Sequence, residues 1–135
     1  MRYILLFTFM PSLLFAASHI EKQIDYSEVH SIYQSRNCFD KATEQEMNFC
    51  GNKSLEASKS KMNSIFNLVI SSAEVKSKSK IQKAQDDWVL YMKSNCVMET
   101  LDSEGGSAYD SIINFCYETK VNERVSYLQW ILSNK

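Results

Sequence analysis

The feature that most constrains how this chain can fold is its four cysteines, which fall into two local pairs. Cys38 stands near Cys50, and Cys96 stands near Cys116. An even number of cysteines in an oxidising compartment predicts disulfides, and four cysteines allow three pairings. The close C-x2-C spacing of zinc sites is absent, and so is the C-x-x-C of redox centres. We therefore expect two structural disulfides and no metal site.

The first eighteen residues have the layout of a secretory signal peptide. One positive charge at Arg2 precedes an apolar run from Tyr3 to Phe15, which is too short to span a bilayer. If the signal peptidase cuts after Ser18, the small residues Ala16 and Ser18 occupy the third-last and last positions before the cleavage site. An uncleaved membrane anchor is the alternative. We expect a signal peptide over residues 1–18 and a periplasmic or secreted protein, with no membrane insertion after processing.

The charge of the processed chain argues against a nucleic-acid partner. Residues 19–135 keep 14 basic and 16 acidic side chains, a net charge of −2. Binding to phosphates needs a cationic surface, which such a chain lacks.

The spacing of apolar residues predicts an all-α domain. The three glycines and single proline give little turn punctuation, and that proline lies in the leader. Thr43-x-x-Glu46 is a capping box that opens a helix reaching about Ile70, and Ser71-x-x-Glu74 repeats the signal before a helix reaching about Leu101. A turn over residues 102–107 precedes a third helix over residues 109–132. We expect an antiparallel three-helix bundle, and residues 24–33 could add a fourth, short helix within the N-terminal segment 19–37.

This layout favours one disulfide pairing. Cys96 and Cys116 are nearly symmetric about Gly106, so an antiparallel hairpin would bring them to the same height. Cys38 precedes the first cap and Cys50 lies about two turns into that helix. We therefore expect the pairs Cys38–Cys50 and Cys96–Cys116.

The cysteines and the residues around them resemble a known family. Along the chain the order is Cys–Ala-Thr–Glu-Met-Asn–Cys, then A-Q-x-x-W-x-x-Y and Cys, then Gly-Gly-Ser, Cys and Arg. This order is similar to that of the LprI-type lysozyme-inhibitor family, whose members are small exported helical domains of bacteria. The resemblance runs from residue 38 to about residue 128, so we place an LprI-like domain at residues 38–135. Met92-Lys93 stands where the family usually has Arg-Asp. The resemblance implies a protein that binds a lysozyme-type hydrolase.

No residue pattern indicates catalysis or a cofactor. The two histidines, His19 and His30, lie outside the predicted bundle, and no nucleophile, metal-protease or phosphate-loop motif occurs. Asp86-Asp87 point in different directions on a helix and are expected to be solvated. An aromatic binding box of Trp88, Tyr91, Tyr109 and Tyr117 is an alternative to a core role for these rings. Among the residues expected in the structural core, Gln85 and Arg124 should form a hydrogen bond between two helices. The expected core residues are Met47, Phe66, Gln85, Trp88, Tyr91, Tyr109 and Arg124.

Laying the helices antiparallel gathers acidic residues at one pole. Part of this follows from acids favouring helix starts, but Glu99 and Asp102 stand at a helix end, where acid is unfavourable. An acidic pole could steer a cationic enzyme. The hypothetical binding residues are Glu99, Asp102, Glu104, Gly105, Gly106, Ser107 and Asp110.

The function implied by the resemblance is inhibition of a lysozyme-type peptidoglycan hydrolase, and we expect it to act by occlusion of the enzyme's cleft. A periplasmic envelope-stress or structural accessory protein is the second hypothesis. An immunity protein against a cell-wall-degrading toxin is a variant of the first. The oligomeric state stays open.

Overall fold

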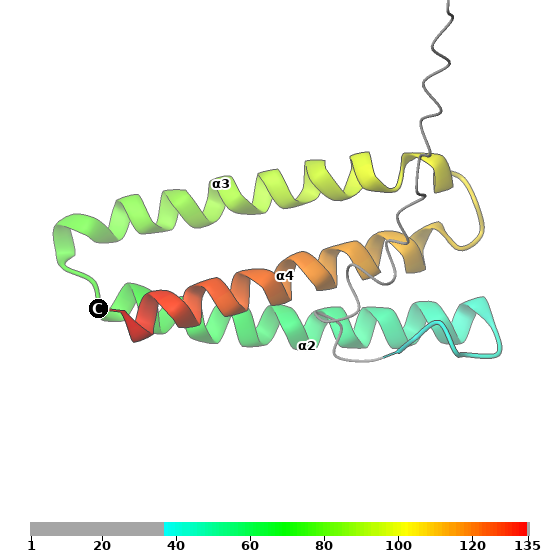
Figure 1. Cartoon of the computed structure of the whole chain (residues 1–135), viewed down its shortest axis with the longest axis horizontal. Coiled ribbons are helices and arrows are strands. Elements are labelled where there is room, and N and C mark those ends of the chain that lie inside the picture. Colours follow the sequence, from blue (N-terminus) through cyan, green and yellow to red (C-terminus); the bar gives the residue numbers. More distant parts are fainter. Residues whose placement is uncertain (1–36, 135) are drawn as a thin grey trace, which may run out of the picture.

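Three long antiparallel helices form the domain in a computed structural model that describes residues 37–134 (Figure 1). They are α2 (Glu44–Ser71), α3 (Val75–Glu99) and α4 (Tyr109–Ser133), with a short 3-10 turn η1 (Leu101–Ser103) after α3. The prediction of an all-α, antiparallel three-helix bundle is confirmed. The predicted leader and the short helix over residues 24–33 lie outside the described residues. None of the described helices is both long and apolar enough to cross a membrane.

Helix α2 begins where the capping signal predicts. The Thr43 side chain accepts a hydrogen bond of 3.2 Å from the Glu46 backbone N–H, which satisfies one of the free donors of the first turn. The second capping prediction is wrong. Ser71 is the last residue of α2, and its hydroxyl donates back to the Leu68 carbonyl. Glu74 occupies the N-cap of α3 without a side-chain capping bond, because Ser71 is still part of α2 and lies too early in the chain to cap α3.

The loop between α3 and α4 depends on a glycine. Gly105 has a φ of +78°, in the left-handed region that side chains with a Cβ rarely adopt. This residue reverses the chain after η1 and allows α4 to return alongside α2. The turn predicted over residues 102–107 is therefore present.

The hydrophobic core lies mainly between α2 and α4, which pack together along most of their length. Helix α3 contacts α4 more than α2 and contributes one buried side chain, Met92, to the core cluster. The buried core consists of Leu55, Met62, Phe66, Val69, Met92, Val121, Val125 and Leu128.

A row of polar contacts sets the register of α2 against α4. Each contact is a hydrogen bond between side chains of the two helices or of the loop before α4, and burial makes the innermost ones costly to break. From the start of α2 inward, the donor–acceptor pairs are Ser107–Glu44, Ser111–Asn48, Asn114–Asn52 and Ser54–Glu118.

Both disulfides form as the layout predicts. Cys38 pairs with Cys50 and draws the segment before α2 back along that helix, with 5.6 Å between their Cα atoms. Phe39 in this segment packs edge-on against Phe115 of α4, at 5.2 Å between ring centroids. Cys96 pairs with Cys116 and ties the end of α3 to α4, with 5.7 Å between Cα atoms.

The structure corrects one predicted core residue. The Tyr91 side chain is 63% exposed, because it projects from the face of α3 that is turned away from the other helices. Phe66 is buried as predicted, and Trp88 is partly buried against the core. Met47 and Tyr109 are half-buried. Tyr91 therefore belongs neither to the core nor to an aromatic box with Trp88.

Candidate functional site

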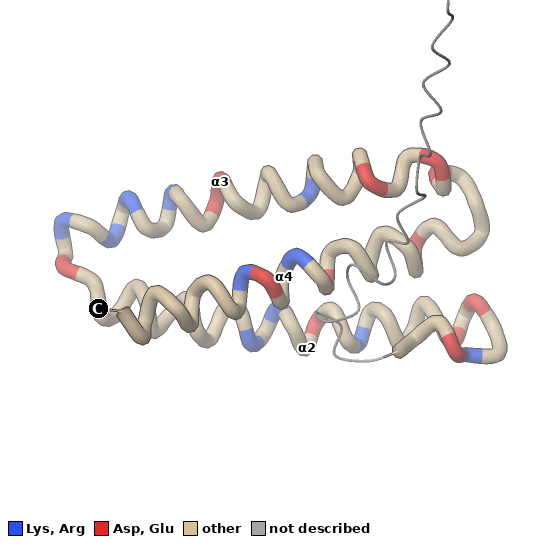
Figure 2. Tube along the Cα trace, viewed as in Figure 1, with Lys and Arg blue, Asp and Glu red and all other residues tan. Residues whose placement is uncertain are grey.

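Acidic residues gather at the end of the bundle where α2 begins, α3 ends and α4 begins (Figure 2). We call this end the acidic pole. Residues 37–46, the first chain segment at the acidic pole, contain one basic residue, Lys41. Four lysines of α3, between Lys76 and Lys83, lie toward the opposite end, whereas Lys59 and Lys61 lie near the middle of α2. The exposed acids of the acidic pole are Asp40, Glu44, Glu46, Asp102, Glu104 and Asp110.

The glycine loop forms the tip of this pole. Asp102 and Glu104 are exposed on it, and Ser107 is anchored to α2 by its hydrogen bond of 2.7 Å to Glu44. An open hollow of about 370 Å³ is lined by this loop and the first turn of α4, including Gly106 and Ile112. The structure thus brings together six of the seven predicted binding residues on one exposed loop and the first turn of α4.

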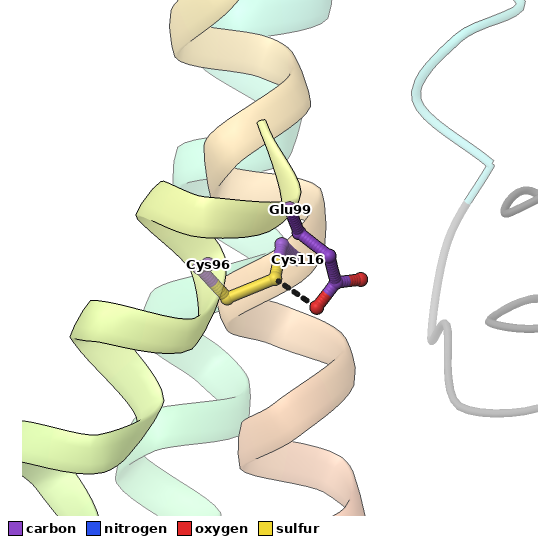
Figure 3. A group of neighbouring side chains, drawn as sticks. All are labelled: Cys96, Glu99 and Cys116. Carbon is purple, nitrogen blue, oxygen red and sulfur yellow. Dashed lines mark hydrogen bonds between the residues drawn. A yellow bond between two sulfur atoms is a disulfide. The ribbon is translucent and has the colours of Figure 1, made fainter. Parts of the chain in front are cut away.

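Glu99 is the exception, because its side chain turns inward between α3 and α4. It is 15% exposed, accepts a hydrogen bond of 2.8 Å from Asn95 and lies 3.7 Å from the ammonium of Lys120. A carboxylate oxygen also lies 3.5 Å from Cys116 Sγ, shown by the dashed line in Figure 3. A disulfide sulfur carries no proton to donate, so this last contact is not a hydrogen bond. The ion pair between Glu99 and Lys120 of α4 therefore explains why an acidic residue is tolerated at the C-terminal end of α3.

The cluster of Cys96, Glu99 and Cys116 has the composition of a metal site but not its chemistry (Figure 3). Metal ligation by cysteine requires thiolates. Both sulfur atoms are bound to each other in the disulfide, so only one carboxylate would remain as a ligand.

The middle of α3 is joined to α4 by a partly buried polar contact between Arg124 and Gln85. Arg124 Nε donates a hydrogen bond of 3.0 Å to Gln85 Oε1, as predicted. The guanidinium lies over the Trp88 ring at 5.2 Å and over the Tyr127 ring at 5.1 Å. Tyr127 in turn stacks on Trp130. Burial lowers the pKa of Arg124 from its ordinary value, an effect that the nearby Tyr127 opposes. The interhelical hydrogen bond expected between Gln85 and Arg124 is therefore present.

Asp86 and Asp87 are exposed, as expected, and each accepts a hydrogen bond from the preceding turn of α3. Gln82 donates to Asp86, and the Lys83 ammonium lies 2.8 Å from Asp87. The bond to Asp87 is the main reason that the pKa of Lys83 is raised. The two carboxylates are exposed to solvent and contact different partners, so they do not form a shared acid–base site.

The sequence pattern missed the outer face of α3. Beside Tyr91, the side chains of Leu90 and Met98 are 65% and 64% exposed on this helix. The signal was present in the sequence, since α3 has apolar residues at helical spacing on two faces rather than one.

Comparison with known proteins gives one family. The model of the family described as "Lysozyme inhibitor LprI" matches residues 36–128, which cover the whole of α2 and α3 and most of α4. No curated protein and no solved structure matches the chain. The two disulfides and this family together indicate an extracytoplasmic protein, because disulfides persist in oxidising compartments. The chain belongs to the LprI lysozyme inhibitor family.

Proposed function

We propose that this protein inhibits a lysozyme-type peptidoglycan hydrolase by binding over its substrate cleft. Membership of an inhibitor family over residues 36–128 is the observation that carries this proposal. The exposed acids of the acidic pole support it, because a cationic enzyme would be drawn to and oriented by such a surface.

The protein acts outside the cytoplasm in this proposal. Residues 1–18 serve as a signal peptide that is removed after Ser18, and the chain then acquires both disulfides in the periplasm or after secretion. The intact mass of the exported protein tests this step. A product that begins at His19 and carries two disulfides supports it, and a product that keeps Met1–Ser18 overturns it.

The function is tested by the rate at which a lysozyme clears a suspension of cell walls. The exported, oxidised protein should slow clearing, and added salt should weaken the effect, because screening shortens electrostatic reach to about 10 Å near 0.1 M. The variant Asp102→Lys/Glu104→Lys should inhibit less than the parent while it keeps the parent's helicity.

A matched control separates position from net charge. Glu56 and Glu74 are exposed acids away from the acidic pole, and they pair with Lys59 and Lys76 at the surface. Glu56→Lys/Glu74→Lys changes the net charge by the same amount and should inhibit as the parent does. Equal inhibition by both double variants would remove the acidic pole from the proposal. No effect of the parent on any muramidase class would favour the envelope accessory protein instead.

A further inference from the structure

The outer face of the second half of α3 is apolar although no described element covers it. Residues on this face recur at the three- and four-residue steps of one helical side. Five of the six are apolar and between 44% and 65% exposed, and the sixth is a serine. We call these six residues the α3 outer face; five lie on α3 and the last begins η1, and they are Leu90, Tyr91, Ser94, Val97, Met98 and Leu101.

This face is not required to hold the bundle together. The side of α3 that packs against the core carries Gln85, Met92 and Cys96, all buried. Helix α3 is therefore apolar on two opposite sides over this stretch. Water contact with a contiguous apolar surface is unfavourable, and on monomeric proteins such patches mark interaction sites.

The composition of the α3 outer face is that of an interface centre. Aromatic residues and methionine are enriched at the centres of protein interfaces, whereas lysine and glutamate are depleted there. Tyr91 and Met98 belong to these enriched types, and no charged residue lies among the six. Ser94 in the middle is small, so a partner surface can approach the helix closely.

The charges at its borders indicate which kind of partner fits. At one end the face continues directly into Asp102 and Glu104 of the acidic pole, and at the other end it meets Asp86 and Asp87. Lys83 is already engaged with Asp87, while Lys93 lies on another side of the helix and lines a groove with Met62 and Tyr117. An apolar surface bordered by acids at both ends is complementary to an apolar patch bordered by cationic side chains.

We propose that the α3 outer face is the apolar centre of the surface that binds the cationic hydrolase, and that the acidic pole is its rim. This inference rests on the proposed function. It divides the work of binding: the acids raise the association rate, and burial of the apolar face slows dissociation.

The test measures association and dissociation rates against a muramidase that the parent inhibits. Leu90→Gln/Met98→Gln should speed dissociation at least tenfold, with little change in the association rate or its salt dependence. Leu68 and Val75 are exposed apolar residues, 57% and 86% exposed, near the opposite end of the bundle. The control Leu68→Gln/Val75→Gln should dissociate as the parent does. A single Tyr91→Ser variant, expected to speed dissociation less, is the second probe should the double variant lose helicity.

Four outcomes are distinguishable. Faster dissociation of the α3 variants alone supports the proposal. Equal dissociation of α3 and control variants overturns it and leaves the proposed function standing. A parent that binds no muramidase contradicts the proposed function and this inference with it. A parent dimer that Leu90→Gln/Met98→Gln splits, with muramidase dissociation unchanged, assigns the face to a second copy of the chain and overturns the proposal.

Discussion

Arg124 shows how a single side chain can join two helices that share few other contacts. It donates a hydrogen bond to Gln85 and places its guanidinium between the rings of Trp88 and Tyr127. A cation over an aromatic ring is worth about 0.5–2 kcal/mol, more when it is withdrawn from water. Since Met92 is the one buried residue that α3 supplies to the core cluster, the contacts of Arg124 and the Cys96–Cys116 disulfide carry much of the attachment of α3.

Replacing Trp88 tests that attachment. Trp88→Ala removes a ring packed against the core and one of the two rings over Arg124, so the free energy of unfolding should fall by about 3 kcal/mol. Trp130→Ala is the control, because that ring is 59% exposed and should cost less than about 1 kcal/mol. Urea unfolding followed by circular dichroism measures both. Unchanged stability of Trp88→Ala would show that the ring does not support the core.

The environment of Tyr117 predicts how the free energy of unfolding changes at alkaline pH. Burial raises the pKa of Tyr117 above its ordinary 10.0, and the neighbouring Tyr109 adds to the shift. Below the unfolded pKa the hydroxyl is protonated in both states and the stabilisation is complete. As the pH rises through the folded pKa, the unfolded chain has already lost its proton, and the stabilisation is lost.

The variant Tyr117→Phe has no proton to lose at this position. Its free energy of unfolding should therefore fall less than that of the parent between about pH 9 and pH 11, in urea titrations with the disulfides intact. Equal falls in the two proteins would contradict a raised pKa for Tyr117.

At the scale of helices, α2 and α4 pack against each other along most of their length, whereas α3 contacts them at few positions. The core and the row of polar contacts lie mainly between α2 and α4. The loop closed by Cys96–Cys116 spans 20 residues, and closing a loop of that length stabilises the fold by about 3 kcal/mol in the chain-entropy model.

Removal of this disulfide should loosen α3 before the other helices. Cys96→Ser/Cys116→Ser should lower the free energy of unfolding by about 3 kcal/mol. Amide protons of α3 should then exchange with solvent faster than those of α2 and α4, because local opening follows the weakest contacts. Cys38→Ser/Cys50→Ser, the comparison, should leave α3 protected. Equal acceleration in all three helices would mean that the bundle opens only as a whole.

Helices and disulfides could be predicted from the sequence because their signals are local. The capping box at Thr43, the glycine loop and the symmetry of Cys96 and Cys116 about that loop each depend on neighbours in the chain. The placement of Tyr91 could not be predicted, since a helix that is apolar on two sides does not reveal which side meets the core. The inward turn of Glu99 depends on Lys120 of another helix, which no pattern within α3 can indicate.

At the scale of the whole molecule, a nearly neutral chain separates its charges along the bundle axis. The acidic pole and the lysines of α3 lie at opposite ends because α3 runs antiparallel to both other helices (Figure 2). Such a distribution orients a charged partner more than it strengthens the final complex. A stable complex would then depend on the apolar α3 outer face beside that pole.

The most direct measurement of the proposed inhibition uses a soluble glycan oligosaccharide as the substrate of the muramidase. A small substrate is hydrolysed in the enzyme's cleft without any cell wall, so loss of activity reports occlusion of the cleft rather than coating of the wall. The exported, oxidised protein should abolish hydrolysis in proportion to the amount added, reaching completion near one equivalent of enzyme. Full hydrolysis in the presence of excess protein, for every muramidase class tested, would contradict the account.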